Sequence, residues 1–425
     1  MPLKVHFSYR FGHKTDMQQG LTKRTVRVIG LMLVCQKRPF RLKHKHVNAR
    51  FAHHHVQHYR SQLERRISHS PQFREGKVIN AMPHITATPS WWQTAWSYFG
   101  GRAQLKPNAQ LPVAPLNLQA LQTRSKALRV TWLGHSSLFI EVDGLRVLTD
   151  PVFDYASPWI AKAWFARNLP NSGVREQLPL PDVIVISHDH YDHLEQASVV
   201  YYAAHSVTFY VPLGVGQHLI RWGVSPERII EFDWWEQIKR EGVEFICTPA
   251  NHNSGRYYLD HNATLWCSWV IKGHQETLYF SGDSAYDTHF AKIAERCGPI
   301  DLACLEVAAD VKQHQGYPVE NWGHMQAKHT VQAFRDLQAK KLLPIHWATY
   351  ELFTHQWDEP IADLVKHCQE QSITLLTPMA GESLTMANHS ASHAWWQGLE
   401  TEPMSGARYW QMGLACSLLL LLMVV

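Results

Sequence analysis

The segment VIVISHDHYDH, residues 183–193, decides the fold because an apolar run leads directly into four side chains that can bind metals. The run VIVI (183–186) is typical of a short strand that is buried on both faces. Alternate side chains of an extended chain face the same way, so His188, His190 and Asp192 are expected to face one site. His193 follows where the chain turns toward a helix. Imidazole and carboxylate together predict zinc, while manganese and iron accept the same ligand types.

Three more candidate ligands stand at the ends of strand-like runs further along the chain. They are His252, Asp283 and His346. Loops at strand ends converge into functional sites, so these side chains are expected near the 188–193 loop. Any one of them alone would more often be structural, but together with the loop they complete a two-metal set.

From about residue 127 the chain alternates short strand-like runs with helical patterns, which predicts sheets covered by helices. Expected strands lie at 128–133, 137–142, 145–150, 183–187, 208–212, 228–232, 243–249, 264–271, 277–282, 302–307, 342–347 and 373–378. Expected helices lie at 193–204, 286–296, 325–338 and 360–369. The expected fold class is therefore α/β.

Further motifs, which metal binding does not require, resemble N-acyl-phosphatidylethanolamine-hydrolysing phospholipase D and its bacterial relatives, within the metallo-β-lactamase superfamily. These motifs are TWLGH (131–135), LTDP (148–151), ISH (186–188), EFDWWE (231–236), IHW (345–347), EP (359–360) and GES (381–383). The likeness runs from about residue 128 to 385 and is more specific than the HxHxDH loop alone.

The resemblance implies a metallo-β-lactamase fold, an αββα four-layer sandwich of two mixed β-sheets covered by helices. It also implies two zinc ions per chain. The first ion would be held by His188, His190 and His252, and the second by Asp192, His193 and His346. Asp283 would bridge both ions and act in catalysis. His324 resembles a family position near the substrate and is the second candidate catalytic residue, although a histidine that starts a helix also commonly bonds to backbone.

Two further residues, His135 and Asp150, are expected to support the ligands through hydrogen bonds rather than to bind metal. The chain departs from the family pattern at 308–310 (AAD), where relatives often carry Gly-Ala-Tyr, and at 327–329 (AKH), where they often carry Pro-Glu-Glu. Both segments are expected near the substrate, so the lipid preference stays open even where the metal chemistry is retained.

The expected catalytic domain, residues 127–388, is flanked by parts of different composition. Residues 1–77 are expected to form a basic, His-rich arm with 17 Lys and Arg against three acids. Because the whole chain carries a net charge of +5, the other residues carry a net charge of −9. Residues 78–126 are expected to be an aromatic extension packed on the body. Residues 389–425 are expected to form a C-terminal tail with an apolar end. A basic arm suits anionic lipid headgroups and nucleic acid alike.

The apolar end, QMGLACSLLLLLMVV (411–425), is short for a membrane span. Fifteen helical residues cover roughly 22 Å, whereas the hydrocarbon core is about 30 Å thick. This end is expected either to dip into a bilayer or to pack on the body. Seven cysteines without a CxxC pair indicate a reducing compartment, and no cleaved signal peptide is expected. The expected location is therefore cytoplasmic, or peripheral on a membrane with the tail as anchor.

The leading hypothesis is a zinc-dependent phosphodiesterase of the phospholipase D type, which hydrolyses N-acyl-phosphatidylethanolamine lipids to phosphatidic acid and N-acylethanolamine. Its expected partners are a phospholipid substrate and a membrane surface but no nucleic acid, and its oligomeric state stays open, with a homodimer as one option. A second hypothesis is a metal-dependent hydrolase of RNA or of small phosphorylated or lactone metabolites. A third is a non-enzymatic, membrane-associated scaffold, against which the complete ligand set argues.

Overall fold

The structure is a computed structural model of the chain. It describes residues 59, 64–81, 107, 110–157, 167–170, 173–256, 260–308, 323–350, 352, 355–387 and 394–399. The predictions for most of the basic arm and for the apolar C-terminal end fall outside these residues. Within the part that is described, no helix is both long enough and apolar enough to cross a membrane.

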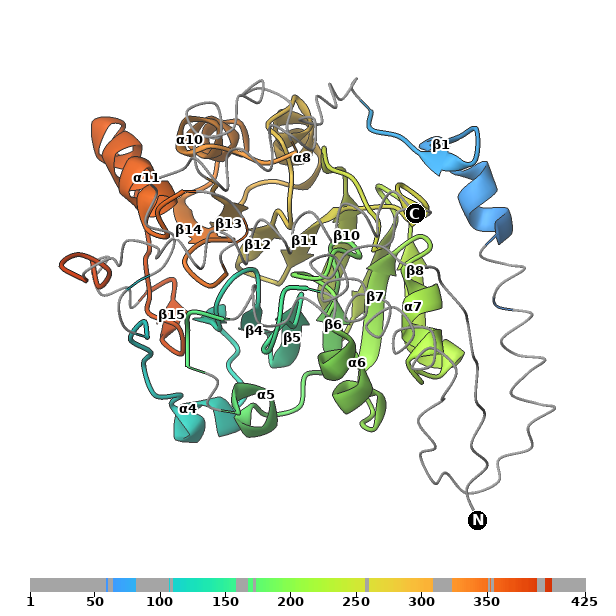
Figure 1. Cartoon of the computed structure of the whole chain (residues 1–425), viewed down its shortest axis with the longest axis horizontal. Coiled ribbons are helices and arrows are strands. Elements are labelled where there is room, and N and C mark those ends of the chain that lie inside the picture. The colour runs from blue at the N-terminus through green and yellow to red at the C-terminus, as the bar shows by residue number, and fades with distance from the viewer. Residues whose placement is uncertain are drawn as a thin grey trace, which may run out of the picture. The chain divides into compact units, whose positions relative to one another are not determined.

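Two mixed sheets form the middle layers of the fold (Figure 1). The seven-stranded sheet has the order β15 (Ser383–Thr385), β3 (Arg129–Trp132), β4 (Leu138–Val142), β5 (Leu145–Thr149), β6 (Val183–Val185), β7 (Thr208–Pro212), β8 (Ile229–Phe232). The six-stranded sheet has the order β14 (Lys341–Ile345), β13 (Leu302–Glu306), β12 (Thr277–Phe280), β11 (Ser268–Lys272), β10 (Val243–Thr248), β9 (Gln237–Arg240). Strands β5 to β8 and β12 to β14 pair in parallel, and the other neighbours pair antiparallel.

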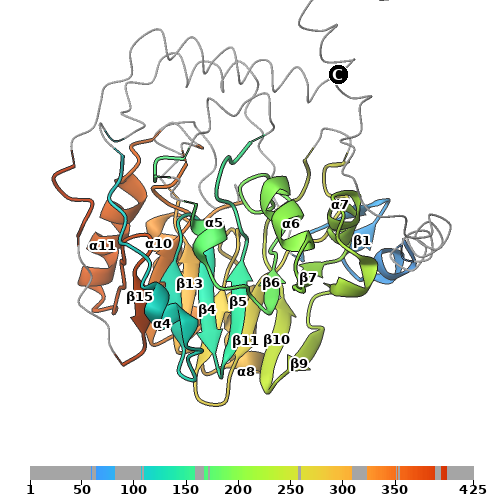
Figure 2. The ribbon, with the colours of Figure 1, turned by 90° about the horizontal axis from the view of Figure 1, so that it is seen from below.

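Helices cover the outer face of each sheet. Over the seven-stranded sheet lie α4 (Leu118–Gln122), α5 (Val174–Gln177), α6 (Gln196–Ala203) and α7 (Gly216–Arg221). Over the six-stranded sheet lie α8 (His289–Cys297), α10 (Ala327–Asp336) and α11 (Glu359–Glu370). Figure 2 shows α4, α5 and α6 in front of the first sheet, with β10, β11 and β13 behind it. The predicted fold class, an αββα sandwich, is confirmed.

Strand β6 shows why the run at 183–186 is apolar without interruption. Val183 and Val185 pack into the core between the two sheets. Ile184 and Ile186 point the other way and pack under the helices of the outer face. Both faces of a strand in the middle of such a sandwich are buried, so the usual polar alternation disappears. The strand therefore holds the loop that follows it on a rigid base.

The edges of the sheets differ from the sequence prediction. The expected strand at 373–378 is wrong, because residues around Leu375 make only an isolated bridge to Leu342 at the edge of β14. Strand β9 was not expected, because its residues, QIKR, are half-exposed or exposed and give no apolar pattern. Strand β15 has only three residues, too few for a pattern. These are edge positions, where burial imposes no clear sequence signal.

A short segment before the main body also folds onto it. Residues 64–69 are helical, and β1 (Phe73–Arg74) pairs with β2 (Lys77–Val78) as a two-stranded hairpin. The backbone N–H of Val78 donates to the carbonyl of Asn262 over 2.8 Å. The hairpin therefore ends beside the loop that follows β10.

Candidate metal centre

All seven candidate ligands lie in loops that directly follow the carboxyl end of a strand. Strand β6 leads into the 188–193 loop, β10 into His252, β12 into Asp283 and β14 into His346. The structure brings all seven into overlapping groups of potential metal-binding atoms. Their assignment as ligands stays a prediction.

His188, His190 and His252 form the first group. The Nδ1 atom of His190 lies 2.9 Å from Nε2 of His188 and 3.2 Å from Nε2 of His252. Three ring nitrogens that converge this closely suit one cation with nitrogen ligands. The group has the membership that the resemblance implies for the first ion.

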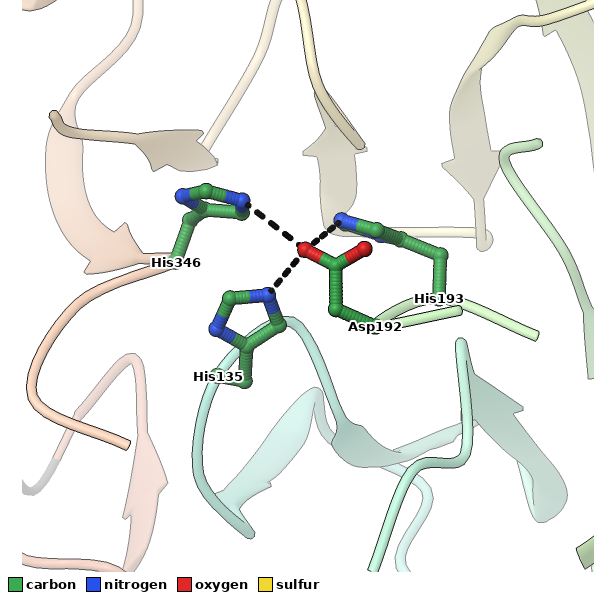
Figure 3. A group of neighbouring side chains, drawn as sticks. All are labelled: His135, Asp192, His193 and His346. Carbon is green, nitrogen blue, oxygen red and sulfur yellow. Dashed lines mark hydrogen bonds and ion pairs between the residues drawn. The ribbon is translucent and has the colours of Figure 1, made fainter. Parts of the chain in front are cut away.

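Asp192, His193 and His346 form the second group, together with His135 (Figure 3). The Oδ2 atom of Asp192 lies 3.5 Å from Nε2 of both His193 and His346. It lies 3.1 Å from Nε2 of His135. In Figure 3 three imidazole rings surround this carboxylate. His135 contacts the carboxylate of a candidate ligand, in keeping with the supporting role expected for it.

Asp283 lies between the two groups. Its Oδ1 atom is 3.1 Å from Nε2 of His193, and its Oδ2 atom is 3.2 Å from Nε2 of His346. On the other side, Oδ2 is 3.7 Å from Nε2 of His252 and 3.9 Å from Nε2 of His188. One carboxylate therefore faces both groups, which is the position of a bridging ligand.

Unsatisfied polar atoms at this point show that the residues fit a bound cation. Among the described residues, Nε2 of His193, Nε2 of His346 and Oδ1 of Asp283 are buried and have no hydrogen-bond partner. Buried polar atoms are nearly always paired, because leaving them unpaired costs their full desolvation penalty. Both ring nitrogens lie within 3.2 Å of the Asp283 carboxylate, so the three atoms offer electron pairs that a divalent cation would satisfy.

The electrostatics divide the centre into two halves. Burial and the charge of His193 hold the pKa of His188 well below the usual histidine range. Burial also favours a lower pKa for His346, but the charge of Asp283 outweighs it and raises that pKa to about 10. Burial favours a raised pKa for Asp283, yet the charges of His193 and His346 hold it well below its usual range. The pKa values of His190 and His252 are also lowered, mainly by burial, so this half favours neutral imidazoles, whereas the carboxylates of the other half attract positive charge.

Asp150 fixes both the 188–193 loop and one candidate ligand, His193, as the sequence led us to expect. It accepts hydrogen bonds from the backbone N–H of Ser187 over 2.7 Å and from its hydroxyl over 2.5 Å. It also accepts from Nδ1–H of His193 over 2.7 Å, which leaves Nε2 as the atom that faces the centre. A carboxylate behind a histidine in this way selects the ring tautomer that a metal requires.

His252 is held by two segments far away in the sequence. Its Nδ1–H donates to the carbonyl of Gly323 over 2.7 Å. The amide side chain of Asn80 donates to the carbonyl of His252 over 2.7 Å and accepts from its backbone N–H over 3.0 Å. The indole of Trp266 donates to the same Asn80 oxygen over 3.0 Å. Nothing in the sequence pattern marked Asn80, which lies two residues after the end of the β1–β2 hairpin.

Asp189 and Arg256 hold the 188–193 loop, and neither belongs to a motif that the sequence revealed. Asp189 is fully buried and accepts from the backbone N–H of Gly255 over 2.7 Å and from the hydroxyl of Thr264 over 3.0 Å. Arg256 donates over 2.7 Å to the carbonyls of both Asp189 and Leu194. Asp189 stands between two ligands in the sequence, and that position was the available signal.

His324, the second candidate catalytic residue, lies against the centre. Its ring centroid is 5.0 Å from that of His252 and 5.1 Å from that of His346. Its Nδ1 atom is 3.7 Å from Oδ2 of Asp283 and 2.8 Å from Oε2 of Glu306. Glu306 is fully buried, and the sequence analysis did not single it out.

The backbone is strained at the site. His346 has φ 69°, His135 has φ 50° and Asp150 has φ 32°, values that residues with a β-carbon rarely adopt. Such strain persists only where the surrounding structure enforces it, and it gathers at functional sites. Gly282, with φ 54°, precedes Asp283 and packs so closely on Ser187 that any β-carbon would collide with that side chain. The backbone thus brings β12 and the 188–193 loop together.

Known proteins resemble this chain at three levels. A family model described as a beta-lactamase superfamily domain matches residues 145–347, which include all seven candidate ligands. An uncharacterised protein of Mycobacterium tuberculosis is 34% identical over 346 residues, or 77% of this chain and 88% of that protein. N-acyl-phosphatidylethanolamine-hydrolyzing phospholipase D 1 of Caenorhabditis elegans is 30% identical over 265 residues, or 59% of this chain and 72% of that protein. The solved structure of Igni18, a metallo hydrolase from Ignicoccus hospitalis, has 19% identity and a TM-score of 0.46, and covers 61% of this chain and 98% of its own.

Proposed function

The chain belongs to the β-lactamase superfamily and is a metal-dependent hydrolase, and we propose that it hydrolyses N-acyl-phosphatidylethanolamine-type phospholipids. The reaction is phosphodiester hydrolysis of the phospholipase D type, with phosphatidic acid and N-acylethanolamine as products. The observation that carries the substrate is the 30% identity to the C. elegans phospholipase, which extends over 72% of that protein.

The proposed cofactor is a pair of zinc ions. The first would be held by His188, His190 and His252, the second by Asp192, His193 and His346, with Asp283 shared. Nitrogen and carboxylate oxygen ligands suit zinc, and the buried unpaired atoms of His193, His346 and Asp283 support a cation there. When bound, such ions supply a nucleophilic water at neutral pH and compensate the negative charge of the phosphoryl oxygens.

The protein's own residues perform the remaining tasks. Asp150 and Ser187 keep the 188–193 loop and the His193 ring in place. The ring of His324 lies beside those of His252 and His346, and this supports its assignment as the side chain that would contact the substrate and support the departure of the alcohol group. Asp283, which faces both ligand groups, is the residue on which the reaction most depends.

The proposed partners are a phospholipid and the membrane surface that presents it, without nucleic acid. The proposed location is cytoplasmic or peripheral on a membrane, with the basic arm and the apolar tail as contacts to lipid. A homodimer is one option for the assembly. Electrostatic attraction between the basic arm and anionic headgroups supports this placement.

The test is release of phosphatidic acid from N-acyl-phosphatidylethanolamine in mixed micelles by zinc-loaded full-length protein. Asp283→Ala removes the carboxylate shared by both groups, so activity should fall by more than about 100-fold. Asp182→Asn serves as the matched control, because Asp182 is a hydrogen-bonded acid at the opposite end of β6. It should retain activity.

A folded, zinc-loaded wild-type protein that releases no phosphatidic acid would remove the lipid assignment. RNA and bis(p-nitrophenyl) phosphate would then test the second hypothesis. If the protein turns over any of these substrates and loses that activity when its metal is removed, the hypothesis of a non-enzymatic scaffold is excluded.

A further inference from the structure

Strand β13 contains a glutamate, Glu306, whose apolar, buried surroundings do not favour a charged side chain. Its residues, Leu302–Glu306, read LACLE and are all buried, and Glu306 is fully inaccessible in the six-stranded sheet. Burying a carboxylate is costly unless hydrogen bonds or a charge compensate for it. The partners of Glu306 should therefore show what this acid does.

Both carboxylate oxygens of Glu306 are engaged at the metal centre. Oε1 accepts from the backbone N–H of Ser284, next to Asp283, over 2.6 Å. Oε2 accepts from Nδ1–H of His324 over 2.8 Å. Oε2 is also 4.0 Å from Nδ1 of His346. One carboxylate oxygen of Glu306 therefore bonds to the loop that carries Asp283, and the other bonds to the ring of His324.

We propose that Glu306 is a positioning residue, which orients His324 toward the substrate and fixes its tautomer. The proposal rests on the proposed role of His324 in phosphodiester hydrolysis. An imidazole that donates from Nδ1 to a fixed carboxylate presents its other nitrogen, Nε2, on the opposite side of the ring. The hydrogen bond to Ser284 keeps the carboxylate from turning, so the orientation of the ring is set by the sheet.

The substitution Glu306→Gln separates this role from a purely structural one. Glutamine has the same size, and only its carbonyl oxygen can accept from the N–H of Ser284. The amide NH₂ then faces Nδ1 of His324, where it can donate but not accept. The ring must turn or change its tautomer, while the backbone contact at Ser284 is kept.

A double-mutant cycle is the main test. Glu306→Gln alone should lower kcat by about 10- to 100-fold with little change in KM and with the zinc content of wild type. In the His324→Ala background, Glu306→Gln should change kcat by less than about twofold, because its effect passes through His324. Glu141→Gln is the matched control, since Glu141 is a fully buried strand glutamate whose partners are Arg129 and Arg146. It should leave kcat unchanged per folded molecule.

The kcat values of the cycle are measured with two substrates, N-acyl-phosphatidylethanolamine and bis(p-nitrophenyl) phosphate. The role of Glu306 can then be tested even if the protein does not hydrolyse the lipid. Histidine ¹⁵N NMR of the zinc-loaded wild type is a second readout that needs neither turnover nor a folded Glu306 variant. The signals that vanish in His324→Ala identify this ring, and its Nδ1 should be protonated. Additive effects in the cycle, loss of zinc in Glu306→Gln, or an unprotonated Nδ1 would each overturn the proposal.

Discussion

At the scale of the residue, the geometry of the candidate ligands depends on the groups that hydrogen-bond to their far side. Asp150 holds Nδ1 of His193, Gly323 holds Nδ1 of His252, and Glu306 holds His324. An imidazole has two similar nitrogens, and only a partner on one of them determines which nitrogen faces the centre. The sequence identified Asp150 because it lies in a motif of the family, whereas Glu306 lies outside any motif.

The substitution Asp150→Asn should weaken metal binding while the fold is retained. Asparagine keeps the size but can turn its NH₂ toward His193, which then presents the wrong tautomer. We expect the zinc affinity to fall by about 10- to 100-fold, measured by competition with a chromophoric chelator. Asp182→Asn is the control, at the amino end of the same strand. Equal zinc affinity in the two variants would contradict the role given to Asp150.

At the scale of the element, the strands position the site and a small hairpin completes it. The central strands were predicted closely, because residues buried on both faces leave a long apolar run. The edge strands β9 and β15 were missed, and the expected strand at 373–378 is wrong. The β1–β2 hairpin supports the centre through Asn80, whose side chain hydrogen-bonds to both the carbonyl and the backbone N–H of His252.

The substitution Asn80→Ala should loosen the first ligand group. It removes both hydrogen bonds to the backbone of His252 and the bond from Trp266. We expect a loss of about 1–3 kcal/mol in the free energy of unfolding, because buried partners are left unsatisfied. The zinc affinity should also fall, by about 10-fold. Urea denaturation and zinc content by mass spectrometry measure the two effects.

Lys77→Ala is the control for this prediction, because Lys77 is an exposed residue of the same hairpin. It should change neither stability nor zinc content. If Asn80→Ala behaves like Lys77→Ala, the hairpin does not support the centre.

At the scale of the whole molecule, the metal centre joins the two sheets. Its candidate ligands follow β6 in one sheet and β10, β12 and β14 in the other. Among the described residues, buried atoms without a hydrogen-bond partner come from both sheets, from His193 after β6 and from Asp283 and His346 after β12 and β14. A bound metal should therefore stabilise the sandwich as a whole rather than a single loop.

Removal of metal should lower the unfolding temperature of the full-length protein. A ligand that binds only the folded state stabilises it by about 2.7 kcal/mol when its free concentration is 100 times Kd. Calorimetry before and after treatment with a chelator measures the shift, and added zinc should restore the original value. An unchanged unfolding temperature in protein shown to have lost its zinc would contradict this coupling.

The sequence by itself determined the fold class, the 188–193 loop and the family, because each depends on residues that are adjacent or regularly spaced. The resemblance to phospholipase D relatives is confirmed by the comparisons, and so is the class of metal-dependent hydrolase. The sequence also marked Asp150 as a supporting residue, but Asn80 and Glu306 emerged only from the folded structure. Asn80 and His252 are 172 residues apart, and no local pattern connects them. The physical reason is that a hydrogen bond needs proximity in space, which the fold creates after the chain has packed.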